Sequence, residues 1–271
     1  MFDLSSAHWW TDELVNREKA LKNRMITAAV AALLANGALA GTYQSEVGLL
    51  GSRTNVEGPR MDVDAATLTG SLYFKPVDDS KGPFLNATFL DHASGITVVR
   101  ADRNAGLDDF STFDARVVTG SGRVIEAGYS DIRGDDTYRL ALGTYLTPVS
   151  QVLLSYTTSK DAAIDVMTAG YRRARKLGGT TALAYSFNAG YVDAKDSGYT
   201  ANANAIYFLN RSFGIGVLAS ASDYNHARVR SGGLQATYFI SSAFHLQGSV
   251  QRTDANGQDE ETFGASVALR F

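Results

Sequence analysis

Residues 262–271 read TFGASVALRF, and apolar and polar side chains alternate along this stretch without a break. A period of two residues indicates a β-strand with one apolar face, because a helix would repeat about every 3.6 residues. The apolar face carries Phe263, Ala265, Val267, Leu269 and Phe271. The other face carries small or polar residues and ends with Arg270. This strand is therefore predicted to separate an apolar environment from a polar one.

The same alternation recurs along the chain back to residue 42, and no stretch after residue 41 shows a helical period over three turns. Fourteen strands are predicted, near residues 42–51, 62–75, 84–101, 111–119, 123–132, 136–146, 151–160, 163–176, 180–194, 198–209, 213–224, 227–240, 243–253 and 260–271. Most of them have the roughly 9–11 residues that a tilted strand needs to cross a bilayer. The third is longer, which indicates a bulge or an extension beyond the membrane.

Two folds explain this pattern: a soluble β-sandwich and a closed barrel in lipid. The water-facing side of a sandwich usually carries Lys and Glu, whereas the polar faces here are mostly Gly, Ser, Thr, Asn, Gln and Ala. In lipid only helices and closed sheets satisfy the backbone hydrogen bonds. The barrel is favoured, and the predicted fold class is all-β: a transmembrane antiparallel up-and-down β-barrel of about 14 strands, within a range of 12–16.

The connections between the predicted strands are of two kinds. Short ones rich in turn-forming residues, such as 120–122, alternate with polar and often longer ones. In outer-membrane barrels the short turns face the periplasm and the longer loops face outward. Residues 75–83, KPVDDSKGP, are long for a periplasmic turn. A constriction of the barrel is expected from one of the longest outer loops, 51–61 or 102–110.

Tyrosines are predicted to form the aromatic girdles at the two membrane interfaces, where an amphipathic ring is favourable. The residues assigned to the girdles are Tyr43, Tyr73, Tyr129, Tyr138, Tyr156, Tyr171, Tyr185, Tyr191, Tyr207 and Tyr238.

The first forty residues are predicted to contain a targeting segment and not part of the folded domain. A positive segment at residues 22–24 precedes an apolar block at 25–34 and the small residues 38–40, which is the order found in a secretory signal peptide. We expect residues 21–40 to be the signal, cleavage between Ala40 and Gly41, and a barrel over 41–271. Residues 1–20 are expected to be a misassigned N-terminal extension. The alternative, a buried Ala-rich helix, is disfavoured because no amphipathic partner helix follows.

Composition excludes several classes of protein. The chain has 271 residues, no Cys and a net charge of −3. It is therefore not a disulfide scaffold, a Cys-ligated metal protein or a polybasic nucleic-acid binder. No phosphate-binding loop or nucleophile elbow is present. We expect no catalytic residue, no cofactor and no metal, and we interpret His92, His226 and His245 as solvated side chains.

The region at residues 43–94 resembles a known family. Residues 72–94, LYFKPVDDSKGPFLNATFLDHAS, and the initial strand with Tyr43, Gln44, Glu46 and Val47 are similar to the start of members of the general bacterial porin family of Gram-negative outer-membrane β-barrels. The terminal Phe271, with Phe263 and Leu269 on the same face, resembles the carboxyl-terminal signal that the barrel assembly machinery reads. The resemblance implies an outer-membrane porin and assigns no ligand residue.

A barrel of fourteen strands spaced by about 4.8 Å has a radius of roughly 14 Å, which leaves a lumen unless a segment plugs it. The predicted lumen-facing charged residues are Glu46, Arg116, Glu126, Arg139, Arg172 and Arg270. A wet, weakly charged lumen predicts passive diffusion of small hydrophilic solutes or ions.

Two alternatives remain open at this point. One is a non-conducting structural or adhesive barrel in which Glu126 pairs with Arg116 or Arg139 and charges close the lumen. The other, disfavoured, is an outer-membrane barrel enzyme.

The predicted location is the bacterial outer membrane, reached by export through the periplasm. The predicted partners are outer-membrane lipid, lipopolysaccharide and the barrel assembly machinery, with no nucleic acid. The sequence leaves open whether the barrel is a monomer or a homo-oligomer.

Overall fold

The computed structural model describes residues 42–56, 61–103, 109–132, 135–160 and 162–271. The predicted N-terminal extension, the signal peptide and the cleavage position between Ala40 and Gly41 lie outside the described residues.

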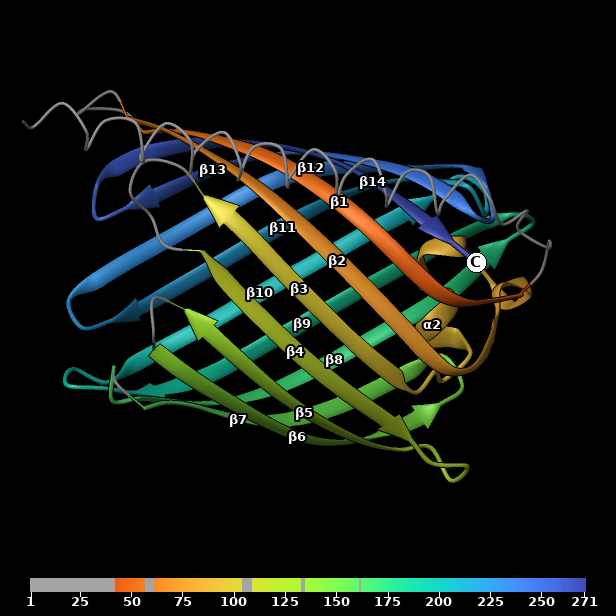
Figure 1. Cartoon of the computed structure of the whole chain (residues 1–271), viewed down its shortest axis with the longest axis horizontal. Coiled ribbons are helices and arrows are strands. Elements are labelled where there is room, and N and C mark those ends of the chain that lie inside the picture. Colours follow the sequence, from red (N-terminus) through yellow and green to blue (C-terminus); the bar gives the residue numbers. More distant parts are fainter. Residues whose placement is uncertain (1–41, 57–60, 104–108, 133–134, 161) are drawn as a thin grey trace, which may run out of the picture. The chain divides into compact units, whose positions relative to one another are not determined.

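Fourteen strands form a closed antiparallel barrel in which each strand pairs with its neighbours in sequence and β1 pairs with β14 (Figure 1). The strands are β1 (Thr42–Val56), β2 (Met61–Asp78), β3 (Gly95–Arg103), β4 (Phe110–Val118), β5 (Arg123–Ile132), β6 (Asp135–Thr147), β7 (Ser150–Ser159), β8 (Ile164–Gly178), β9 (Thr181–Asp193), β10 (Gly198–Phe208), β11 (Phe213–Tyr224), β12 (Ala227–Ser241), β13 (Phe244–Ala255) and β14 (Gln258–Arg270). The predicted fold class and the strand number of 14 are confirmed.

Closure joins the two ends of the described chain. β1 and β14 run antiparallel from the pair Glu46–Arg270 to the pair Val56–Glu260. The carbonyl oxygen of Phe271 accepts hydrogen bonds from the backbone N–H groups of Gln44 and Ser45, both at 2.8 Å. The sheet therefore has no free edge between its first and last strands, as a barrel in lipid requires.

The two faces of the wall differ as the alternation predicts. Large apolar side chains on the outer face remain exposed, among them Leu154 (66%), Val217 (54%) and Leu234 (60%). Such an exposed apolar band is suited to lipid, because a water-soluble protein rarely leaves so much apolar surface uncovered. Phe263 and Phe271 of the terminal strand belong to the same outer face, exposed at 48% and 36%.

Two of the tyrosines assigned to the girdles lie inside the barrel instead. Tyr43 is only 5% exposed. Its ring meets Tyr73 edge to face at 5.7 Å and lies under the Arg270 guanidinium at 4.5 Å. The register of β1 against β2 shifts between Tyr43 and Ser45, and this bulge changes the alternation at the start of β1. The girdle assignment is therefore wrong for Tyr43 and Tyr73.

The third predicted strand is wrong over its first half. β3 begins only at Gly95, and the preceding residues form two short 3-10 helices, η2 (Asp79–Lys81) and η3 (Phe84–Asn86), and one helical turn, α2 (Ala87–Leu90). In Figure 1 α2 lies at the end of the barrel where the carboxyl terminus also lies. We call this end, which also carries the short turns, the turn end, and the opposite one the loop end.

One of the outer loops, 51–61 or 102–110, is expected to narrow the barrel. The ends of both loops belong to the flanking strands β1 to β4, and their central residues 57–60 and 104–108 lie outside the described residues. Within the described part of the chain, none of the helices is long and apolar enough to span a membrane.

The assignment of the two faces predicts opposite effects for neighbouring substitutions. Val217 pairs with Ala205 and Leu234 on the outer face, whereas Leu218 points into the lumen. We expect Val217→Arg to lower the free energy of unfolding by about 2–4 kcal/mol, because it places a charge in hydrocarbon. The matched variant Leu218→Arg should change it much less. Urea unfolding of the barrel in lipid vesicles measures both, and equal losses would contradict the assignment.

Candidate functional site

The connection between β2 and β3, residues 79–94, folds back into the barrel at the turn end, and we call it the inward segment. It is held together by its own side chains. Asp91 accepts a hydrogen bond from the backbone N–H of Asp78 at 3.0 Å and forms an ion pair with Lys81. The N–H of Ala93 donates to the carbonyl of Thr88 at 2.9 Å. The segment is thus a compact unit and not an extended loop.

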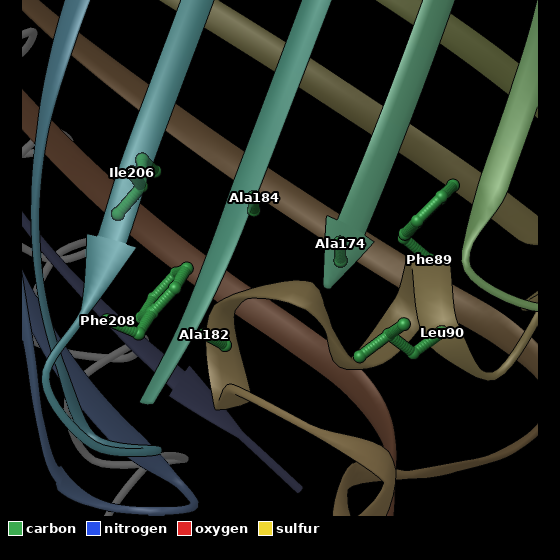
Figure 2. Packing of buried hydrophobic residues seen from close by; sticks show 7 residues of the cluster. All are labelled: Phe89, Leu90, Ala174, Ala182, Ala184, Ile206 and Phe208. Atoms are coloured by element: carbon green, nitrogen blue, oxygen red, sulfur yellow. The ribbon is translucent and has the colours of Figure 1, made fainter. Parts of the chain in front are cut away.

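Apolar side chains attach the inward segment to the lumen wall. Phe89 and Leu90 of α2, exposed at only 2% and 8%, belong to one buried cluster with side chains from three strands (Figure 2). The wall contributes Ala174 of β8, Ala182 and Ala184 of β9, and Ile206 and Phe208 of β10. Burying a side chain such as Phe or Leu stabilises a contact by about 1.5–3 kcal/mol. The small alanines provide the space that α2 occupies.

Three arginines fasten the inward segment through its oxygen atoms. Arg172 donates to Asn86 Oδ1 at 3.0 Å, and Arg270 donates to the carbonyl of Phe84 at 2.9 Å. Arg211 donates to the carbonyls of Gly82 and Asp79. The ends of such short helices leave carbonyls without partners, and the planar guanidinium groups satisfy them.

The same arginines lie over aromatic rings. The Arg172 guanidinium lies 4.4 Å from the centre of Phe89, and that of Arg211 lies 4.4 Å from the centre of Phe84. Arg270 additionally forms an ion pair with Glu46. Cation–π contacts of this kind favour a fixed orientation of the guanidinium plane.

Tyr145 of β6 contacts the inward segment from the opposite side. Its hydroxyl donates to the carbonyl of Phe89 at 2.9 Å. Its ring stacks on Phe89 and lies tilted against the ring of His92. His92 Nε2 is 3.2 Å from the carbonyl oxygen of Pro148 in the β6–β7 turn. The segment is therefore tied to β6 and to β8–β10 as well as to its own flanking strands.

The histidines differ from the expectation that all three are solvated. His226 is exposed and pairs with Asp196 at 2.9 Å. His92 lies against the ring of Tyr145 in a tilted arrangement with a centroid distance of 3.7 Å. His245 is only 6% exposed and stacks on Phe239 at 4.5 Å. The interpretation is wrong for His245, because the residues near the turn end are covered by the inward segment and the wall and not by water.

A charge cluster projects into the lumen from β4, β5 and β6. Glu126 accepts from both Arg116 and Arg139, and Arg139 also pairs with Asp114 at 2.9 Å. Arg116 reaches on to Gln151 Oε1 at 3.1 Å. A Cβ at Gly128 would lie 2.5 Å from Asp114 Oδ1, so the glycine provides the space for this pair. Two cations and two anions neutralise each other here.

All six charged residues predicted to face the lumen lie on the inner side of the wall. They fall into three groups: Glu46 with Arg270, Arg116 with Glu126 and Arg139, and Arg172 at the inward segment. Sequence reasoning missed Arg211, Asn86 and Tyr145. The unusual length of the 75–83 connection, followed directly by the apolar residues of 84–90, was the signal that could have identified the inward segment.

A cavity of about 520 Å³ lies in the lumen beside the inward segment. Its lining includes Asn86 of η3, the charged side chains Arg116, Glu126 and Arg172, and a series of amides. Among the residues that the structure describes, no group of His, Asp or Glu is arranged to hold a metal ion.

Comparisons with known proteins agree with this architecture. No protein-family model matches the chain, and no curated protein matches its sequence. The crystal structure of the Acinetobacter baumannii outer membrane protein Omp33 is similar at a TM-score of 0.68 and 25% identity, over 86% of this chain and 100% of that chain. A bacterial polysaccharide outer membrane secretin is similar in fold, with a TM-score of 0.52 and 10% identity over 84% of this chain and 99% of that chain. The chain shares the closed β-barrel fold of these outer-membrane proteins, as its sequence predicts.

The docking of α2 predicts protection of its buried side chains. The chain has no Cys, so a single introduced thiol can be followed without background. We expect Leu90→Cys to react with a water-soluble maleimide roughly tenfold more slowly than Ser80→Cys, because reaction at residue 90 requires local opening. Ser80 lies on the exposed side of the inward segment and is the matched control. Equal rates in the folded barrel would show that α2 is not docked.

Proposed function

We propose that the protein is a passive-diffusion channel for small hydrophilic solutes or ions, narrowed at the turn end by the inward segment. The lining of the lumen between the segment and the loop end carries the proposal. Small hydroxyl and amide groups bond in cross-strand pairs, such as Thr112 with Ser130 at 3.0 Å and Asn188 with Asn202 at 2.8 Å. Such groups keep water in a lumen that fourteen strands leave too wide for side chains to fill.

The orientation and the partners belong to the same proposal. The turn end, which carries residue 42 and Phe271, would face the periplasm, and the chain would reach the membrane by export. The outer apolar face would contact outer-membrane lipid, and the polar loop end would contact lipopolysaccharide. The barrel assembly machinery would recognise the terminal strand through Phe263, Leu269 and Phe271.

One observation supports a second candidate function, a barrel with a closed lumen. Glu126 bridges Arg116 and Arg139, and the inward segment occupies the lumen at the turn end. This is the arrangement expected of a structural or adhesive barrel that conducts no solute. The charge cluster lies on the adjacent strands β4 to β6, and a cavity of about 520 Å³ remains in the lumen beside it. The presence of this cavity favours the channel.

Removing the inward segment tests the channel directly. In the test variant Gly-Ser-Gly replaces residues 76–94, which comprise the inward segment and the last three residues of β2. We expect it to conduct roughly twofold or more above the wild type in a planar bilayer, because the narrowest part of the path is gone. Leu90→Glu, which places a charge in the apolar contact of α2, should raise conductance through a barrel of unchanged length. Ser80→Glu on the exposed side is the control. A folded wild-type barrel without conductance would exclude the channel and favour the closed barrel.

The charge cluster should set part of the ion preference. Glu126→Gln leaves Arg116 and Arg139 with one carboxylate fewer, so we expect the reversal potential in a KCl gradient to move toward chloride. Both guanidinium groups are about 30% exposed to lumen water, which can solvate them after the change. Glu261→Gln on the outer face of β14 removes the same charge without lining the lumen. A shift of the same size in that control would contradict the role of the cluster.

A further inference from the structure

Arg172 differs from the other arginines of the lumen. Arg116, Arg139, Arg211 and Arg270 each pair with a carboxylate. Among the described residues no carboxylate lies within ion-pair distance of Arg172, whose only hydrogen bond is the one to Asn86. Its side chain nevertheless remains exposed on the lumen side of β8. The positive charge of Arg172 is therefore available to pair with an anionic group of a solute in the lumen.

The guanidinium of Arg172 is already held in place. Phe89 covers one face of its plane at 4.4 Å, and Asn86 Oδ1 binds one terminal nitrogen at 3.0 Å. The remaining N–H groups are free to bind an acceptor. Because a planar guanidinium matches the two oxygens of a carboxylate, a fixed Arg binds such a group with little further loss of side-chain freedom.

The cavity in front of Arg172 carries a net positive charge. Its charged lining residues are Arg116, Glu126 and Arg172, and Glu126 is already shared between two arginines. The remaining polar lining consists mainly of amides: Asn86, Gln151, Asn188, Asn204, Gln235 and Gln247. Within the described part of the chain, Gln235 Nε2 is buried without a hydrogen-bond partner.

Amides both donate and accept, so this lining suits a ligand with several hydroxyl groups. The cavity volume of about 520 Å³ lies in the range of sites for small molecules, roughly 300–1,000 Å³.

We propose that this cavity is a binding site for a small hydroxylated carboxylate, of the size of a sugar acid, whose carboxylate pairs with Arg172. The inference rests on the proposed function, since the ligand enters through the lumen. It assigns the inward segment a second role beside narrowing the path. Asn86 and Phe89 of that segment orient the residue that selects the solute.

The test uses gluconate as the probe and separates binding from conduction. Gluconate is titrated into the folded chain in detergent by calorimetry and, separately, added to single channels in a planar bilayer. We expect saturable binding by the wild type and transient block of the current. Arg172→Gln should weaken binding roughly tenfold or more, because it removes a charge-assisted hydrogen bond. Arg173→Gln, at the next residue on the opposite face of β8, should bind gluconate as the wild type does.

Two further ligands test whether the site recognises the carboxylate group of gluconate. Sorbitol, which has the hydroxyl groups but no carboxylate, should bind at least tenfold more weakly than gluconate, roughly the contribution of one charged pair. Chloride at equal concentration should not displace gluconate. Equal binding of sorbitol, displacement by chloride, wild-type affinity in Arg172→Gln, or no binding by the wild type would each overturn the site. A barrel that binds gluconate but carries no current would instead refute the channel and leave the site standing.

Discussion

The structure depends on one constraint: in lipid every backbone hydrogen bond of the wall must be made within the wall. An open sheet would leave a row of N–H and C=O groups on each edge without partners, and each unpaired group costs several kcal/mol in hydrocarbon. The ladder between β1 and β14 removes both edges at once. Because a closed sheet has one face toward lipid and one toward the lumen, the alternation of residue types along every strand follows from closure.

Closure at fourteen strands leaves space inside the barrel, and the inward segment occupies part of that space. Eight strands can be filled by their own side chains, whereas fourteen leave a lumen. Here the β2–β3 connection enters that lumen at the turn end and docks through Phe89 and Leu90. Arginines of the wall then bind its carbonyl and amide oxygens. The apolar contact stabilises the docked segment but does not fix its orientation. The hydrogen bonds from the guanidinium groups fix that orientation.

The sequence predicted the features that depend on local pattern. The strand number follows from the two-residue alternation along each strand, which needs no knowledge of distant residues. The same alternation predicts the inward direction of the charged residues Glu46, Arg116, Glu126, Arg139, Arg172 and Arg270. The docking of α2 could not be predicted in this way. Phe89 and Leu90 belong to one cluster with Ala174, Ala182 and Phe208, residues far apart from them in sequence. The alanines on β8 and β9 look ordinary until a helix lies against them.

The girdle assignment is wrong for Tyr43 and for Tyr73, and the two errors have different structural causes. Tyr43 lies inside because a bulge shifts the register at the start of β1, which the pattern does not reveal. Tyr73 lies between Leu72 and Phe74, which are 49% and 54% exposed on the outer face, so parity alone assigns it to the lumen. Its residue type suits an interface, but its position along the strand does not.

A disulfide across the closing ladder tests the central claim most directly. The Cβ position of residue 48 lies 3.4 Å from Cβ of Ala268, close to the separation that a disulfide requires. Since the chain has no other Cys, Gly48→Cys with Ala268→Cys can form only this bridge within one molecule. The closed barrel predicts near-complete intramolecular oxidation of the folded protein in lipid, and none for Gly48→Cys with Val267→Cys, whose side chain points to the opposite face. Free thiols in the first pair, or a bridge between two molecules only, would contradict closure.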